Sequence, residues 1–132
     1  MKKKRLRKSP LKPAEIEAYR RILLEKRAEV LGDVTEMEQE ALGSRSGALS
    51  SFPQHLADQG SDEYDQSLAL GLAASQRALL REIDAALDRI EQGTFGVCEL
   101  LGTPIAKARL DATPWTRLSL EGARQADKSA GL

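Results

Sequence analysis

Few residues in this 132-residue sequence could act as nucleophiles, general bases or metal ligands. Cys98 is the single cysteine and His55 is the single histidine, and they lie far apart in the sequence. A lone thiol cannot form an internal disulfide. The sequence also lacks a serine–histidine–acid set, a glycine-rich phosphate loop and a pair of carboxylates in an evident cleft. We therefore expect that this protein is not an enzyme and that it works by binding a partner.

The charges are distributed unevenly, although the formal net charge is zero. Residues 1–12 carry seven cations and no acid, so the rest of the chain holds 13 cations against 20 acids. A run of cations can bind phosphate groups without sequence preference, which makes nucleic acid a possible partner. The alternative is a solvated, disordered tail, because no aromatic residue is interleaved to stack on bases. The cations that we consider for nucleic-acid contact are Lys2, Lys3, Lys4 and Arg5.

A long amphipathic helix is predicted from Pro13 to about Leu42, since proline is well tolerated in the first turn of a helix. Its apolar residues repeat every seven positions, which is typical of a helix that pairs with another helix. Lys26 and Arg27 interrupt the second stripe, so the seam is imperfect. The first stripe is Ile16, Leu23, Val30 and Met37, and the second is Tyr19, Val34 and Ala41.

A second long helix is predicted from about Ser61 or Asp62 to Gly93, after a Gly- and Ser-rich connection over residues 43–61. Asp62 and Glu63 place negative charge at the positive end of the helix dipole. Gly93 is expected to end the helix as a C-terminal cap. The expected apolar stripe is Leu72, Leu79, Leu80, Ile83, Leu87 and Ile90.

The two helices have matched lengths, and neither could bury its stripe alone, so antiparallel pairing is favoured. We predict an all-α protein: a long antiparallel two-helix coiled-coil hairpin over residues 13–93, with the loop 43–61 at its tip. A basic tail (1–12) precedes it, and a small C-terminal lobe (94–125) and a frayed tail (126–132) follow. The lobe is expected to end in a short helix at about Trp115–Gln125.

No apolar run approaches the length of a membrane span, and the N-terminus lacks the apolar region of a signal peptide. We expect no membrane association, a cytoplasmic location and a monomer.

The segment after the second helix resembles the zinc-finger segment of the DksA/TraR family. The resemblance depends on Gly93-Thr94-Phe95-Gly96-Val97-Cys98-Glu99, on the Gly102-x-Pro104-Ile105 turn and on Arg109-Leu110-x-Ala112-x-Pro114-Trp115. The preceding helix, over residues 79–91, is also similar to the second coiled-coil helix of that family. The similarity covers about residues 13–125 and implies a coiled coil joined to a zinc-finger-like lobe.

The resemblance assigns the four zinc-ligand positions of the family to Cys98, Leu101, Ser119 and Gly122. Structural zinc takes four nitrogen or sulfur ligands, and a single thiolate cannot supply them. We therefore predict that this finger is degenerate and holds no zinc. Apolar burial is the expected replacement, in a small core that Leu101 forms with Leu100, Ile105, Leu110, Trp115 and Leu118. Cys98 is expected to be a small buried residue rather than a redox sensor.

The same resemblance implies a transcription regulator that binds RNA polymerase and inserts the tip of its coiled coil into the secondary channel. It places one tip acid at Asp58, puts His55 where the family has another acid, and puts Gly60 at the small tip residue. Asp62 lies beside them. Two alternatives stay open: a zinc-free coiled-coil adaptor, and a nucleic-acid-associated protein that uses its basic tail.

Overall fold

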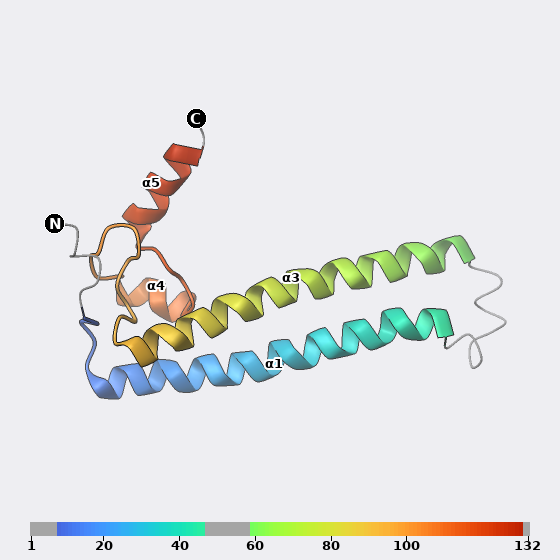
Figure 1. Cartoon of the computed structure of the whole chain (residues 1–132), viewed down its shortest axis with the longest axis horizontal. Helices are drawn as coiled ribbons and strands as arrows, with labels where there is room; N and C mark the ends of the chain where they lie inside the picture. Colours follow the sequence, from blue (N-terminus) through green and yellow to red (C-terminus); the bar gives the residue numbers. More distant parts are fainter. Residues whose placement is uncertain (1–7, 47–58, 131–132) are drawn as a thin grey trace. The chain divides into compact units, whose positions relative to one another are not determined.

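The computed structural model describes the backbone of residues 8–46 and 59–130 and the side chains of residues 8–41 and 63–130. The regular elements of this part of the chain are all helices (Figure 1). They are α1 (Pro13–Ser46), α3 (Gln59–Gln92), α4 (Lys107–Ala112) and α5 (Leu120–Ala130). None of the described helices is both long enough and apolar enough to cross a membrane.

Helix α1 begins at Pro13, as the sequence predicts. The Glu15 carboxylate reaches back and accepts a hydrogen bond of 2.8 Å from the backbone N–H of Lys12. The Lys12 carbonyl accepts the N–H of Ile16 at 3.0 Å. This arrangement is one half of a capping box, in which an acid three residues into the helix pairs with the N–H of the cap residue.

Both long helices extend further toward the connection than predicted. Helix α1 continues to Ser46 rather than ending near Leu42, and α3 begins at Gln59 rather than at Ser61 or Asp62. Glycine and serine lower helix propensity without blocking a helix, and residues 43–46 contain no proline. The predicted loop 43–61 is therefore too long at both ends.

Helix α3 ends where the sequence predicts. Gly93 has a φ of 81°, a left-handed conformation that glycine adopts without steric cost. The N–H of Thr94 then donates to the carbonyl of Arg89 at 2.9 Å, which satisfies one of the last carbonyls of the helix.

The chain divides into two compact units, residues 1–26 with 82–132 and residues 27–81. In the first unit, Arg20 of α1 pairs with Glu91 of α3 at 2.9 Å. In the second unit, Glu38 pairs with Arg77, and the Gln66 side chain donates to the carbonyl of Ala41 at 2.8 Å. Later residues of α1 meet earlier residues of α3 in the second unit, so the two helices run antiparallel there. The first unit joins the start of α1, the end of α3 and the lobe, and so crosses the segment boundary predicted at Gly93.

The buried face of α1 agrees with the predicted seam. Its core residues are Tyr19, Leu23, Val30, Val34 and Ala41. On α3 the prediction is partly wrong, because Leu72 is 47% exposed and its neighbour Ala73 is buried. A small residue at the seam lets two helices approach closely. The leucine stripe in the sequence does not reveal that Ala73, and not Leu72, faces the seam.

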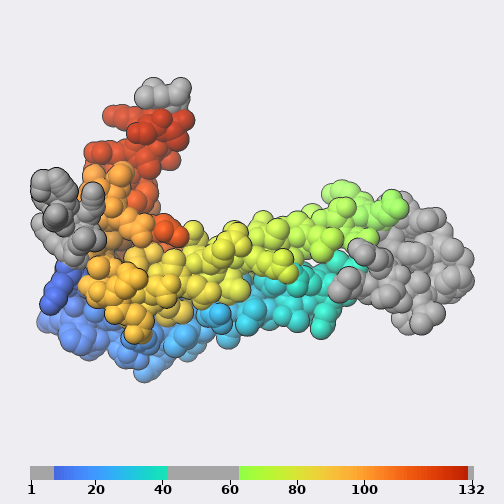
Figure 2. All heavy atoms as spheres, in the orientation of Figure 1, coloured from blue at the N-terminus to red at the C-terminus, as the bar shows by residue number. Residues whose placement is uncertain are grey.

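The lobe of the first unit folds back after Gly93 and forms a continuous surface with the end of α3 (Figure 2). Val97 and Pro104 form an isolated antiparallel bridge, and Gly96 and Gly102 have φ values of 88° and 71°. The buried side chains differ from the predicted small core, because Leu100 is 48% exposed and Leu101 is only half-buried. Ile105 and Leu110 of the predicted core are buried, and Phe95, Val97 and Cys98 fill the lobe with them.

The final helix is also displaced from its predicted position. Helix α5 spans Leu120–Ala130 rather than Trp115–Gln125, so residues 126–130 are helical and not frayed. The Ser119 hydroxyl accepts the N–H of Gly122 at 3.0 Å, which is how an N-cap serine starts a helix. Residues 115–118 stay outside the helix because several of their carbonyls accept hydrogen bonds from arginine side chains. The six-residue α4 was not predicted, because one and a half turns carry no measurable periodicity.

Candidate functional site

Most of the predicted partner-binding residues lie outside the described parts of the chain. His55 and Asp58 fall within 47–58, and Lys2, Lys3, Lys4 and Arg5 fall within residues 1–7. Gly60 and Asp62 lie in the first turn of α3, where the backbone is described. Their roles at the tip stay predictions.

The four positions that the resemblance assigns to zinc ligands come together in the lobe. Cys98 is fully buried, and Ser119 and Gly122 are buried beside it. An ideal Cβ built on Gly122 would lie 2.5 Å from the Cys98 sulfur and 3.3 Å from the Ser119 hydroxyl oxygen. Leu101 takes part through its backbone, whose N–H forms a hydrogen bond to the Cys98 sulfur. The four positions therefore lie close together, although three of them carry no metal-binding side chain.

Hydrogen bonds to the Cys98 sulfur oppose the effect of its burial. Burial on its own raises the pKa of the thiol, because it penalises the thiolate. The side chain and backbone of Ser119 and the backbones of Leu101 and Leu100 hydrogen-bond to the sulfur, and together they lower its pKa below the usual value. The side chain stays inaccessible, so this thiol is buried as predicted.

The residues present do not fit a structural zinc ion. Among the side chains that the structure describes, no three His, Cys, Asp or Glu residues gather as metal ligands would. The backbone at Gly122 also lies so close to Cys98 that a side chain at position 122 would clash with the sulfur. A tetrahedral ion about 2.3 Å from each sulfur needs the opposed ligand positions further apart.

Arginine and tyrosine side chains join the lobe to the two helices. The sequence did not point to Arg89, and it placed Tyr19 in the helix seam without its bond to Asp111. Arg89 is 7% exposed, and burial lowers the pKa of its guanidinium group, with Glu99 opposing that change. Tyr19 donates a 2.5 Å hydrogen bond to Asp111, and burial together with that bond raises its pKa to about 12. One signal for Arg89 was available, since it lies three residues after Ala86 and six after Ile83, on the buried stripe of α3.

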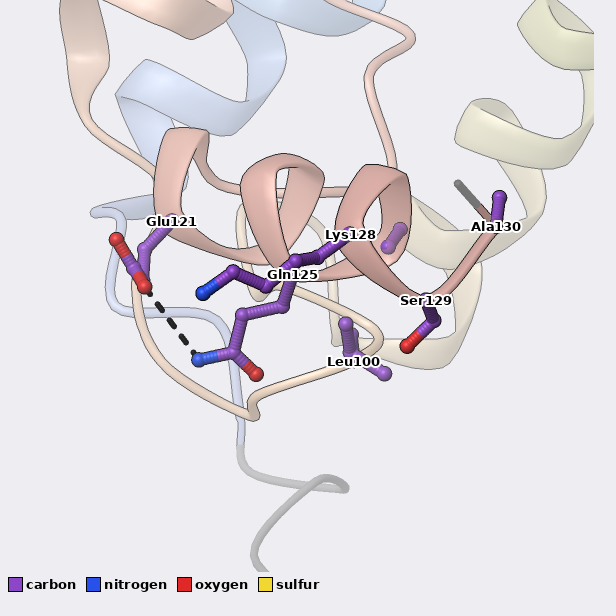
Figure 3. A pocket seen from close by; sticks show the side chains of 7 residues that line it. Leu100, Glu121, Gln125, Lys128, Ser129 and Ala130 are labelled. Atoms are coloured by element: carbon purple, nitrogen blue, oxygen red, sulfur yellow. Dashed lines mark hydrogen bonds between the residues drawn. The ribbon is translucent and has the colours of Figure 1, made fainter. Parts of the chain in front are cut away.

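A surface depression lies between the exposed Leu100 and helix α5 (Figure 3). Its rim includes Glu121 and Gln125, whose side chains are joined by a 3.4 Å hydrogen bond. Lys128 and Ser129 come from the same helix. The depression carries neither a titratable cluster nor a buried polar group, so its lining does not define a catalytic pocket.

Paired antiparallel helices, joined to a small lobe around a cysteine-bearing turn, define a class of helical-hairpin proteins. The structure of transcription factor DksA2 from Pseudomonas aeruginosa has the same fold, with a TM-score of 0.79 and 28% identity, over 91% of this chain and 88% of that one. The coiled-coil hairpin fold predicted from the sequence is confirmed.

Curated relatives identify the family, although no family model matches the sequence. The RNA polymerase-binding transcription factor DksA of Escherichia coli (strain K12) is 32% identical over 112 residues, which cover 82% of this chain and 68% of that protein. The DksA of Caulobacter vibrioides (strain NA1000 / CB15N) is 47% identical over 66 residues, half of this chain and 46% of that protein. The chain belongs to the DksA/TraR family, and both of these relatives are named RNA polymerase-binding transcription factors. They are regulators, so this chain is not an enzyme, as predicted.

Proposed function

We propose that the protein regulates transcription by binding RNA polymerase, with the connection between α1 and α3 entering the secondary channel. Family membership supports this proposal most strongly, since the DksA of Escherichia coli aligns over 82% of this chain and is named for polymerase binding. The buried seam supports it as well, because Leu23 and Val30 are almost fully buried and stabilise the pairing of the helices that flank the connection.

Asp58 is the residue that we expect to act at the tip, with Gly60, Asp62 and His55 around it. A carboxylate suits a site that holds Mg²⁺ and basic side chains, because hard cations take oxygen ligands. His55 replaces a family acid, so the chemistry at this tip differs from that of members with two acids.

The test separates binding from activity. Core RNA polymerase is incubated with the protein and with Asp58→Asn, and both capture and transcription from a regulated promoter are measured. We expect capture to be unchanged and the effect on transcription to be lost. Asp127→Asn is the matched control, because Asp127 is an exposed acid on α5. Failure of the unaltered protein to bind polymerase would refute the proposal.

We also propose that the lobe works without structural zinc. The donor set and the position of Gly122 against Cys98 support this proposal. Elemental analysis of the purified protein tests it, together with thermal unfolding before and after chelation. One tightly held zinc ion per chain, with a loss of stability on chelation, would overturn it.

The same samples distinguish polymerase regulation from the two alternative functions, a coiled-coil adaptor and a nucleic-acid-associated protein. A zinc-free adaptor would bind a different protein and leave transcription by purified polymerase unaltered. A nucleic-acid-associated protein would depend on Lys2, Lys3, Lys4 and Arg5, and its binding would fall steeply with salt. A location in the bacterial cytoplasm, where RNA polymerase works, follows from the leading proposal, and we propose that the protein acts there as a monomer.

A further inference from the structure

The lobe consists of two arms, and its fold needs an interaction that holds the two arms together. The first arm, residues 94–105, carries Cys98 and Leu101, and the second arm, residues 113–122, carries Ser119 and Gly122. A zinc ion with two ligands from each arm would join them through its coordination bonds. The residues of this chain do not fit that ion, so another contact must do this work.

Arg89 lies at the end of α3 and touches both arms. Its Nη2 donates to the carbonyl oxygens of Trp115 and Thr116, at 3.3 and 3.2 Å, on the second arm. Its Nη1 lies 3.5 Å from the Glu99 carboxylate, on the first arm. The Arg89 side chain is only 8% exposed, so its guanidinium group is shielded from water, whereas the Glu99 side chain is 43% exposed.

Arg117 forms a second, more exposed layer of the same contact. Its Nε donates to the Glu82 carboxylate of α3 at 2.7 Å, and its Nη1 lies 3.4 Å from Glu99. The N–H of Glu99 donates to the carbonyl of Arg117 at 2.9 Å. The Glu99 carboxylate therefore lies between two guanidinium groups, one from α3 and one from the second arm.

A buried guanidinium group is costly unless its charge and its N–H donors are satisfied. Arginine has a planar fork of donors that can reach several acceptors at once, whereas a lysine ammonium is a point charge. The contacts of Arg89 use that fork, because they reach two carbonyls on one arm and a carboxylate on the other.

We propose that Arg89, with Glu99 as its counter-charge, is the cross-link that holds the two arms of the lobe in place of a metal ion. The cross-link joins each arm to α3 and closes the lobe around Cys98. This proposal depends on the metal-free lobe proposed above, and it names the residues that make that lobe possible.

The test uses the full chain and measures amide hydrogen exchange. Arg89→Met and Arg89→Lys are expected to accelerate exchange by about tenfold or more at Glu99, whose N–H pairs with the Arg117 carbonyl across the two arms, because a hydrogen bond to a charged group is worth at least that factor. Exchange over residues 30–41 of α1 is expected to stay unchanged. Lysine should fail to rescue the lobe, because one ammonium cannot span both arms.

Arg77→Lys is the matched control. Arg77 also lies on α3 and pairs with a carboxylate, Glu38, but it is 55% exposed and remote from the lobe in sequence. We expect it to leave exchange at Glu99 unaltered. If Arg89→Met fails to fold, Glu99→Gln must still lower the protection of the N–H at position 99, which pairs with the Arg117 carbonyl of the other arm.

The outcomes separate this proposal from the metal-free lobe. The cross-link proposal is overturned if Arg89→Lys keeps full protection of the lobe amides from exchange. It is also overturned if exchange accelerates equally in the lobe and over residues 30–41. In either case a zinc-free sample would still support the metal-free lobe. Stoichiometric zinc whose removal opens the lobe would overturn both.

Discussion

The backbones of Leu100 and Leu101 hydrogen-bond to the sulfur of Cys98, and these bonds favour its thiolate form. The sequence shows that the other ligand positions are Leu101, Ser119 and Gly122. The sequence could not show that the backbone at Gly122 packs directly against the Cys98 sulfur, a contact that is possible only because glycine has no Cβ. It also pointed to Leu100 as a core residue, whereas the turn exposes that side chain.

Gly122→Ala is expected to destabilise the protein by about 1–3 kcal/mol, the usual cost of overpacking a core. The new Cβ would lie 2.5 Å from the Cys98 sulfur. Chemical denaturation measures the free energy of unfolding. Gly71→Ala is the control, because nothing lies within 4 Å of its Cβ position on α3. That change should be neutral or stabilise by up to about 1 kcal/mol. Equal effects of the two substitutions would contradict the close contact.

Tyr19 makes the stability of the first unit sensitive to alkaline pH. Its pKa is raised to about 12 by burial and by the hydrogen bond to Asp111, above the ordinary value of 10.0. A raised folded-state pKa gives stability that is complete below pH 10 and is lost as the pH rises toward 12. Tyr19→Phe should therefore flatten the fall in unfolding free energy between these pH values. It should also cost about 0.5–1.5 kcal/mol at neutral pH. An unchanged alkaline slope would refute this role.

At the scale of elements, heptad spacing predicted the buried stripe of α1 well, because a long helix repeats its signal many times. It failed on α3 at Leu72, where the exposed leucine and the buried Ala73 reverse the hydrophobic expectation. Helix α4 and the position of α5 depend on tertiary hydrogen bonds, such as the one from Arg109 to the carbonyl of Leu118 at 2.7 Å. Local sequence does not encode such bonds.

Two adjacent leucines of α1 test the seam. Leu23 is 0% exposed and Leu24 is 49% exposed. Leu23→Ala is expected to cost about 2–5 kcal/mol, because it removes buried methyl groups and leaves a cavity. Leu24→Ala should cost less than about 1 kcal/mol, since its side chain is half in water. Thermal or urea unfolding followed by circular dichroism measures both changes. Similar losses would show that the helices do not pair through this face.

For the whole molecule, the family could be recognised from short motifs around Cys98, and the relatives confirm it. The partner contact could not be tested in the same way, because Asp58 lies outside the described residues. The fold identifies the family, whereas the activity of one member has to be argued from the residues of its own site.

The basic tail gives a separate prediction about nucleic acid. Replacing Lys2, Lys3, Lys4 and Arg5 by alanine should leave the capture of core polymerase unchanged. If these cations bind duplex DNA, the slope of log affinity against log salt should fall by about 0.9 for each phosphate that the altered tail no longer neutralises. Retention on DNA at several salt concentrations measures the slope. An identical slope before and after the substitution would exclude the tail as a nucleic-acid contact.

The attachment of residue 9 limits where that tail can act. The N–H of Ser9 donates to the carbonyl of Gly93 at 2.7 Å, and Leu11 lies against Gly96. The eight residues before Ser9, at about 3.5 Å each when fully extended, can reach at most roughly 28 Å from this attachment point. A phosphate bound by Lys2, Lys3, Lys4 or Arg5 would therefore lie within about this distance of Gly93, extended by the length of one lysine or arginine side chain.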